Sequence, residues 1–118
     1  MNTLPESFKE DLILIRKDLE SRYSTPLFGK CIESSELVLN YLTSKKIKAV
    51  VVEGWCLYDD PHYGSDRPYD EHTWVEIPSL GIIVDLTLDQ FQVAIVDPIE
   101  PVFVGPLPYF LKYQKPNY

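Results

Sequence analysis

The stretch "DEHTWVEI", residues 70–77, decides the fold that this sequence predicts. From His72 onward polar and apolar residues alternate, which is typical of a strand whose successive side chains point to opposite faces of a sheet. His72, Trp74 and Glu76 therefore share one face. A histidine at the start of a strand can reach the end of a packed helix, so the rest of the chain decides whether its role is structural or chemical.

The segments on both sides of this strand predict an antiparallel sheet. Residues 47–58, "IKAVVVEGWCLY", are apolar and β-branched enough for a buried strand. The loop at 59–71, "DDPHYGSDRPYDE", carries turn residues throughout. A turn at 78–81 leads into a further strand at 82–88, "IIVDLTL", and residues 91–118 offer one more strand and a proline-punctuated tail.

Two amphipathic helices are predicted before the strands. Residues 5–23 carry apolar side chains at helical spacing with charged residues between them, and Thr3 followed by Glu6 fits a capping box. The second helix is predicted at 30–44. Two helices followed by three or four strands indicate one α+β domain over residues 1–118, with N-terminal helices packed on a small antiparallel sheet.

Composition excludes several classes of function. The net charge of −7 argues against nucleic acid as a partner, because phosphate contacts need clustered Lys and Arg. No apolar run approaches the roughly 20 residues that cross a bilayer, and the charged first twenty residues do not resemble a secretory signal. We therefore expect a cytoplasmic protein, or one exported without a cleaved signal peptide, with no membrane partner.

The two cysteines, Cys31 and Cys56, do not make a disulfide framework in a chain of 118 residues. They lack the close spacing of a zinc site, and His62 and His72 complete no recognisable ligand pattern. The sequence therefore predicts no metal or other cofactor, and at least one free thiol. Cys56 lies in an apolar segment and is expected to be buried.

Cys31 lies at the first turn of the second predicted helix, where unpaired backbone N–H groups and the helix dipole favour thiolate over thiol. Lys30 adds a positive charge, and Gly29 permits a backbone conformation that allows close approach of a substrate. The alternative is that Cys31 is a small core residue on the buried face of the helix.

Asp85 interrupts the apolar run at 82–88, and a buried carboxylate needs a partner. An imidazole N–H of His72 on the adjacent strand satisfies it, fixes the tautomer of His72 and stabilises its protonated form. The chain thus supplies a nucleophile, a base and an orienting carboxylate in the order Cys31, His72, Asp85. Gln90 follows and can donate its amide to a developing oxyanion; the alternative is an exposed loop glutamine.

Four segments together resemble the core of the papain-like and transglutaminase-like superfamily, in which a helix with an N-terminal cysteine packs on strands bearing His and Asp. The resemblance covers residues 29–91. Its segments are "GKCIESSELVLNYL", "VVVEGWCLY", "EHTWVEI" and "IIVDLTLDQF".

The compact core with a glutamine shortly after the aspartate resembles the papain-fold toxin and deamidase branch, whose members convert a protein glutamine to glutamate. The resemblance implies that Cys31 is the nucleophile, His72 the general base and acid, Asp85 the orienting residue and Gln90 an oxyanion-hole donor. Papain-type proteases place that glutamine before the cysteine, and the preceding segment here, "YSTPLFGK", has none. The backbone N–H of Cys31 then provides a second donor.

The predicted activity is thiol-dependent acyl transfer at an amide of a protein or peptide substrate, with glutamine deamidation first. A small leader-peptide type cysteine peptidase, a transglutaminase and an inactive binding module of the same fold remain alternatives. The predicted substrate-binding residues are Gly29, Lys30, Asp70 and Trp74, the last either shielding the site or filling the core. The acidic loop at 59–71 would favour a substrate segment bearing Lys or Arg.

Overall fold

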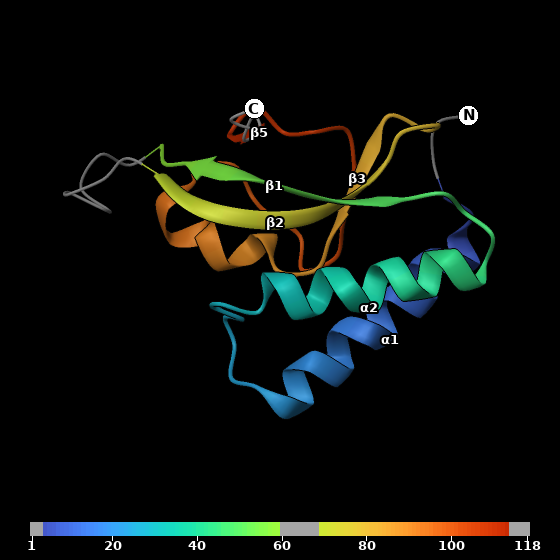
Figure 1. Ribbon diagram of the computed structural model, residues 1–118. Coiled ribbons are helices and arrows are strands. Elements are labelled where there is room, and N and C mark those ends of the chain that lie inside the picture. Colours follow the sequence, from blue (N-terminus) through green and yellow to red (C-terminus); the bar gives the residue numbers. More distant parts are fainter. Residues whose placement is uncertain (1–3, 60–68, 114–118) are drawn as a thin grey trace.

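Two helices, α1 (Glu6–Arg22) and α2 (Cys31–Ser44), lie on one side of an antiparallel sheet (Figure 1). The computed structural model describes residues 4–59 and 69–113. The sheet has five strands in the order β4-β3-β2-β1-β5, so β2 is central. The other elements are β1 (Val50–Leu57), β2 (Tyr69–Ile77), β3 (Ile82–Asp85), the 3-10 helix η1 (Leu88–Ala94), β4 (Phe103–Gly105) and β5 (Leu111–Tyr113).

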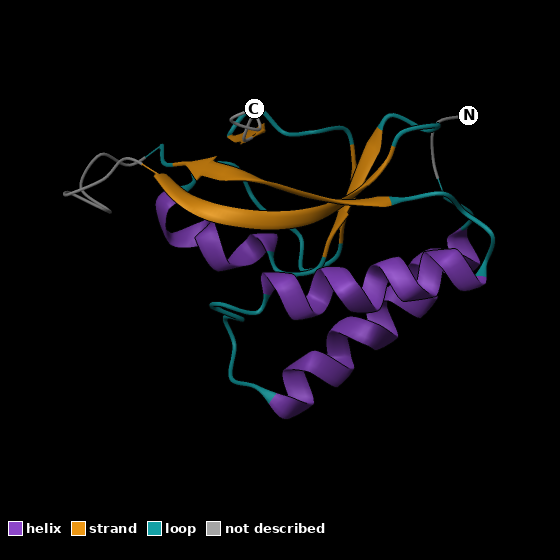
Figure 2. Cartoon of the chain, in the orientation of Figure 1, coloured by secondary structure: helices purple, strands orange, loops and turns teal. Residues whose placement is uncertain are grey.

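The two helices and the α+β class with an antiparallel sheet are confirmed. Figure 2 shows the helices as one layer beneath the strands, with η1 next to the start of β2. Pro5 precedes α1 without a side-chain capping bond, and Thr3 lies outside the described residues. Within the described part of the chain, no helix has both the length and the apolar character needed to cross a membrane.

The predicted strand boundaries needed correction in two places. The strand expected at 82–88 ends at Asp85, and the chain then turns into η1. The loop expected at 59–71 gives way to β2 at Tyr69, so Asp70 and Glu71 are strand residues paired with β1. Pairing with β1 recruits them although their own strand propensity is low. The middle of that loop, with His62, lies outside the described residues.

From His72 to Val75, strand β2 is buried on both faces, which the alternation of "HTWVEI" does not predict. Val75 and Ile77 pack in one cluster with residues of α1, α2 and β3. Trp74 packs in a second cluster that includes Phe91 of η1 and Leu111 of β5. A central strand covered on both sides is held rigidly, and β2 carries His72.

A buried arginine fixes α1 to the chain that follows β3. The guanidinium of Arg16 donates to both carboxylate oxygens of Asp89, at 2.7 and 3.0 Å, and to the carbonyl of Leu86 at 2.7 Å. Bidentate pairing of this kind compensates for the cost of burying the charge. The contact holds the start of η1 against α1.

Gly54 of β1 allows β5 and the core to approach closely. A Cβ at this position would collide with the Lys112 carbonyl of β5 and with the indole of Trp74. Only glycine leaves room for both the Lys112 carbonyl and the Trp74 ring. Because Gly54 has no side chain, the Trp74 ring can pack against β1 at the position where β5 also approaches it.

Candidate active site

Cys31 is the first residue of α2, and the loop before it is shaped by Gly29. Gly29 has a φ of +73°, in the left-handed region that favours glycine, while no atom lies within 4 Å of a Cβ built there. The glycine is therefore needed for its backbone conformation and not for space. The resulting turn leaves the Cys31 thiol partly exposed and free of any disulfide.

Lys30 precedes the helix but does not lie in the pocket beside Cys31. Its ammonium is 4.0 Å from the ring centroid of Tyr23, a cation–π contact that holds the side chain against the end of α1. Lys30 is absent from the described residues that line the pocket. Its predicted place in substrate binding therefore has no support in the structure.

His72 is held inside the protein, with 2% of its surface exposed. Its ring lies between those of Phe91, with centroids 4.9 Å apart and edge-on, and Trp74, at 5.9 Å. Its Nε2 is 2.5 Å from Oδ2 of Asp85. Its Nδ1 has no hydrogen-bond partner among residues 4–59 and 69–113, which leaves this nitrogen for the thiol of Cys31.

Each carboxylate oxygen of Asp85 has a hydrogen-bond partner. While Oδ2 meets His72, Oδ1 accepts the backbone N–H of Thr87 at 2.9 Å. The expected pairing of the buried carboxylate with the imidazole is therefore present. The second bond fixes the carboxylate plane and, through it, the orientation of the His72 ring.

Charge at the site favours a thiolate beside an imidazolium. Burial lowers the pKa of His72, but the charge and hydrogen bond of Asp85, with a smaller effect of Cys31, raise it to about 9. Burial raises the pKa of the Cys31 thiol, but the neighbouring His72 and donors of Thr73 outweigh it, and the pKa is lowered. In the thiolate–imidazolium pair the otherwise unpartnered Nδ1–H gains an acceptor.

Thr73 is a site residue that the sequence analysis missed. It favours the thiolate of Cys31 through its backbone and side-chain donors, and its own carbonyl accepts the hydroxyl of Ser35 of α2 at 3.3 Å. The sequence feature that could have identified Thr73 is its position next to His72 in the strand. Its side chain therefore lies on the opposite face, which is the face on which α2 packs.

Cys56 is also a free thiol, but it contrasts with Cys31 in exposure and in the direction in which its pKa is shifted. It is fully buried in β1, as predicted. Burial, together with the charges of nearby aspartates including Asp85, raises the pKa of its thiol to about 12. Cys56 is therefore an inert core thiol.

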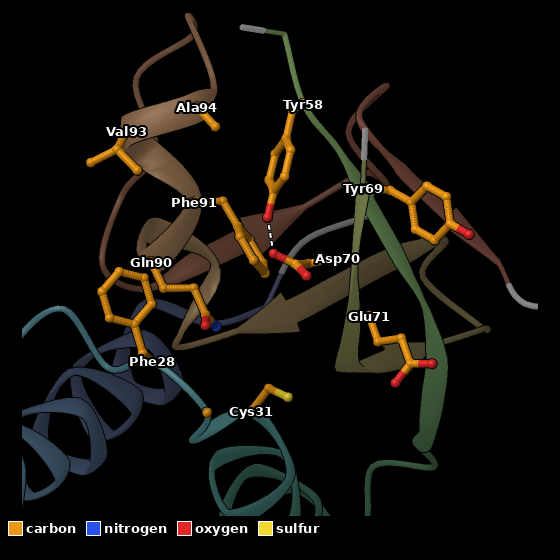
Figure 3. Close-up of a pocket in the computed structure, with 11 residues that line it drawn as sticks. Phe28, Cys31, Tyr58, Tyr69, Asp70, Glu71, Gln90, Phe91, Val93 and Ala94 are labelled. Atoms are coloured by element: carbon orange, nitrogen blue, oxygen red, sulfur yellow. Dashed lines mark hydrogen bonds between the residues drawn. The ribbon is translucent and has the colours of Figure 1, made fainter. Parts of the chain in front are cut away.

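Gln90 lies on η1, where it is buried and not the exposed loop glutamine of the alternative reading. Its side-chain nitrogen donates to the carbonyl of Thr87 at 2.9 Å. An amide nitrogen carries two hydrogens, so one N–H remains available. Figure 3 shows the amide of Gln90 directed toward the end of the pocket where Cys31 lies.

A pocket of about 770 Å³ opens above Cys31 (Figure 3). Its walls come from the loop before α2, from the start of β2 and from η1. Of the predicted substrate-binding residues, Gly29 and Asp70 line it. Trp74 is fully buried behind His72, so of its two predicted places the core is the observed one.

No three His, Cys, Asp or Glu side chains within the described ranges come together as a metal-binding group. No protein-family model matches the chain, and no curated protein and no solved structure matches it either. The spatial arrangement of Cys31, His72 and Asp85 is therefore the observation from which function has to be argued.

Proposed function

We propose that this protein is a cysteine hydrolase of the papain-like and transglutaminase-like type, and that it deamidates a glutamine of a protein substrate. One observation carries the proposal. The 2.5 Å contact of His72 Nε2 with Asp85 leaves Nδ1 without a partner, next to a partly exposed thiol whose pKa is lowered. This is the relation that a thiol nucleophile needs to its base and to the group that orients the base.

The reaction follows from these positions. The thiolate of Cys31 attacks the side-chain amide carbon, and the C–N bond breaks as His72 gives its Nδ1 proton to the departing ammonia. The product is a thioester on Cys31. Water then attacks the thioester carbon while His72 accepts a proton, and the thiolate leaves. The net change is glutamine plus water to glutamate plus ammonia.

The attack by the thiolate and the later attack by water each form a tetrahedral intermediate with a negatively charged oxygen. Two hydrogen-bond donors are available to stabilise this oxyanion. The backbone N–H of Cys31 is among the first N–H groups of α2, which have no acceptor within the helix. The free N–H of the Gln90 amide is the second, since Gln90 and Cys31 line the same pocket. Donors fixed before the reaction stabilise developing charge without reorganisation.

A peptidase or a transglutaminase uses the same residues and differs only in the amide attacked or in the nucleophile that resolves the thioester. The resemblance of "DLTLDQF" to the deamidase branch supports deamidation over these two. An inactive binding module is disfavoured by the partial exposure of Cys31 on a pocket, because a silent cysteine has no need of an accessible thiol.

The proposal is tested with a small glutamine amide, benzyloxycarbonyl-glutaminyl-glycine, and with casein as a protein glutamine source. Wild type and Cys56→Ala are expected to release ammonia, and Cys31→Ser and His72→Ala are expected to release none. Peptide-bond cleavage without ammonia release would transfer the proposal to the peptidase. Lysine crosslinks formed together with ammonia would transfer it to the transglutaminase, because acyl transfer to lysine also releases the glutamine nitrogen as ammonia. Absence of all three products, with a Cys31 thiol of ordinary reactivity, would refute it.

A further inference from the structure

The pocket above Cys31 has two walls of different chemistry. Figure 3 shows Asp70 and Glu71 on one side and Phe28 and Val93 on the other, with Cys31 at the base between them. A substrate that places an amide over the thiol must therefore pass between an acidic wall and an apolar wall.

The acidic wall is carried by the start of β2. Glu71 is exposed and has no hydrogen-bond or ion-pair partner among the described residues. Asp70 is half-buried and accepts a hydrogen bond from the hydroxyl of Tyr58. No Lys or Arg occurs among the described residues that line the pocket, so this wall attracts a cation.

Asp59, part of the acidic loop predicted to attract a basic substrate, does not contribute to this wall. Its Oδ2 accepts the hydroxyl of Tyr109 at 2.6 Å and the backbone N–H of Val96 at 3.0 Å. These bonds tie the chain that follows β1 to the segment after η1 and to the segment before β5. The charge that faces the pocket comes from β2.

The apolar wall is exposed to an unusual degree. Phe28 and Val93 are each 60% exposed, although they come from separate segments, the loop before α2 and η1. Two large, exposed apolar side chains that line the same pocket gain stability when a ligand covers them. Phe91 continues this wall inward to the ring of His72.

We propose that the site selects a peptide segment with a Lys or Arg side chain on one side of the attacked amide and an apolar side chain on the other. Glu71 and Asp70 receive the cation, and Phe28 and Val93 receive the apolar group. This inference rests on the proposed thiol chemistry and adds the class of substrate to it.

The test uses peptides that carry a chloroacetamide where the attacked amide would lie, flanked by Phe and Lys. Matched peptides replace Lys by Glu or Phe by Gly. The alkylation rate of Cys31 is followed by intact mass, with iodoacetamide as the reference reagent. In wild type the Lys peptide is expected to react about five-fold faster than the Glu peptide, and the Phe peptide about ten-fold faster than the Gly peptide.

Two pairs of variants assign each preference to its wall. Glu71→Lys is expected to invert the Lys-to-Glu ratio, whereas Glu100→Lys, the same change at a distant exposed glutamate, leaves the ratio as in wild type. Phe28→Ala is expected to abolish the Phe-to-Gly ratio, whereas Ile13→Ala on α1 leaves it. Added salt should weaken the first ratio and not the second.

Three results would contradict the proposal, and each would overturn a different part of it. Rapid iodoacetamide alkylation of Cys31 with both peptide ratios near one would overturn the two-walled subsite and leave the thiol chemistry standing. Slow alkylation of Cys31 by every reagent would overturn the proposed function and this inference with it. Ratios that respond equally to Glu71→Lys and Glu100→Lys would show that overall charge, and not the β2 wall, selects the peptide.

Discussion

Nε2 of His72 lies 2.5 Å from Oδ2 of Asp85, and this contact sets the chemistry of both ring nitrogens. Because Nε2 is occupied, a proton exchanged with Cys31 must use Nδ1. The pair also explains why a buried histidine keeps its charge, since the carboxylate raises its pKa against the effect of burial.

Asp85→Asn is expected to keep the volume of the side chain and remove the charge that stabilises the His72 imidazolium. The pKa of His72 should then fall well below about 9, since burial lowers it and only the smaller effect of Cys31 still raises it. We expect turnover to fall by about 10²-fold or more. A histidine titration followed by NMR measures the shift, and an unchanged pKa in Asp85→Asn would contradict the role given to this carboxylate.

The raised pKa of His72 also predicts how stability depends on pH. The folded value of about 9 exceeds the unfolded value of 6.5, so the stabilisation is complete below pH 6.5 and is lost as pH rises through 9. The lowered pKa of Cys31 acts in the opposite direction, because it adds stability as pH rises toward 9.0, so the effect of His72 is isolated in Cys31→Ser. In this variant we expect a loss on the order of 2 kcal/mol in the free energy of unfolding between these limits. Urea unfolding across this range measures it.

The control for this pH effect adds His72→Gln and Asp85→Asn to Cys31→Ser, which replaces the ion pair by two amides. Its free energy of unfolding should lack the decline between pH 6.5 and 9. The same decline in both proteins would assign it to other groups.

Gly54→Ala is expected to destabilise the fold, because the added methyl meets the Lys112 carbonyl and the Trp74 indole. Overpacking of this kind costs about 1–3 kcal/mol. Gly105→Ala in β4 is the matched control, since a Cβ there has its nearest contacts at 3.8 Å, on the ring of Phe103. Equal urea midpoints for the two variants would mean that β5 and the Trp74 ring can move to accommodate the added methyl at little cost in stability.

The sequence was a good guide to local structure and to the pairing of His72 with Asp85. Apolar spacing predicted α1 and α2 because each helix buries one face, and Cys31 could be placed at a helix start because Gly29 ends the preceding loop. The pairing of Asp85 with His72 followed from the cost of an unpaired buried carboxylate.

Features set by tertiary contacts were not predictable in this way. One further strand was predicted in residues 91–118, whereas the structure has two, β4 and β5. They are three residues each and exist because longer neighbours offer them hydrogen bonds. Thr73 matters through the packing of α2 on β2, and Lys30 lies along Tyr23 because a ring is available there. None of these partners is close enough in sequence to leave a periodic signal.

The central claim is that His72 activates Cys31, and the most direct measurement is the pH dependence of iodoacetamide alkylation at each cysteine in wild type and His72→Ala, with folding checked by circular dichroism. We predict that Cys31 reacts as a thiolate below its ordinary pKa of 9.0, that Cys56 does not react, and that the reactivity of Cys31 at neutral pH is lost in His72→Ala. A Cys31 thiol that titrates at its ordinary value in both proteins would contradict the account.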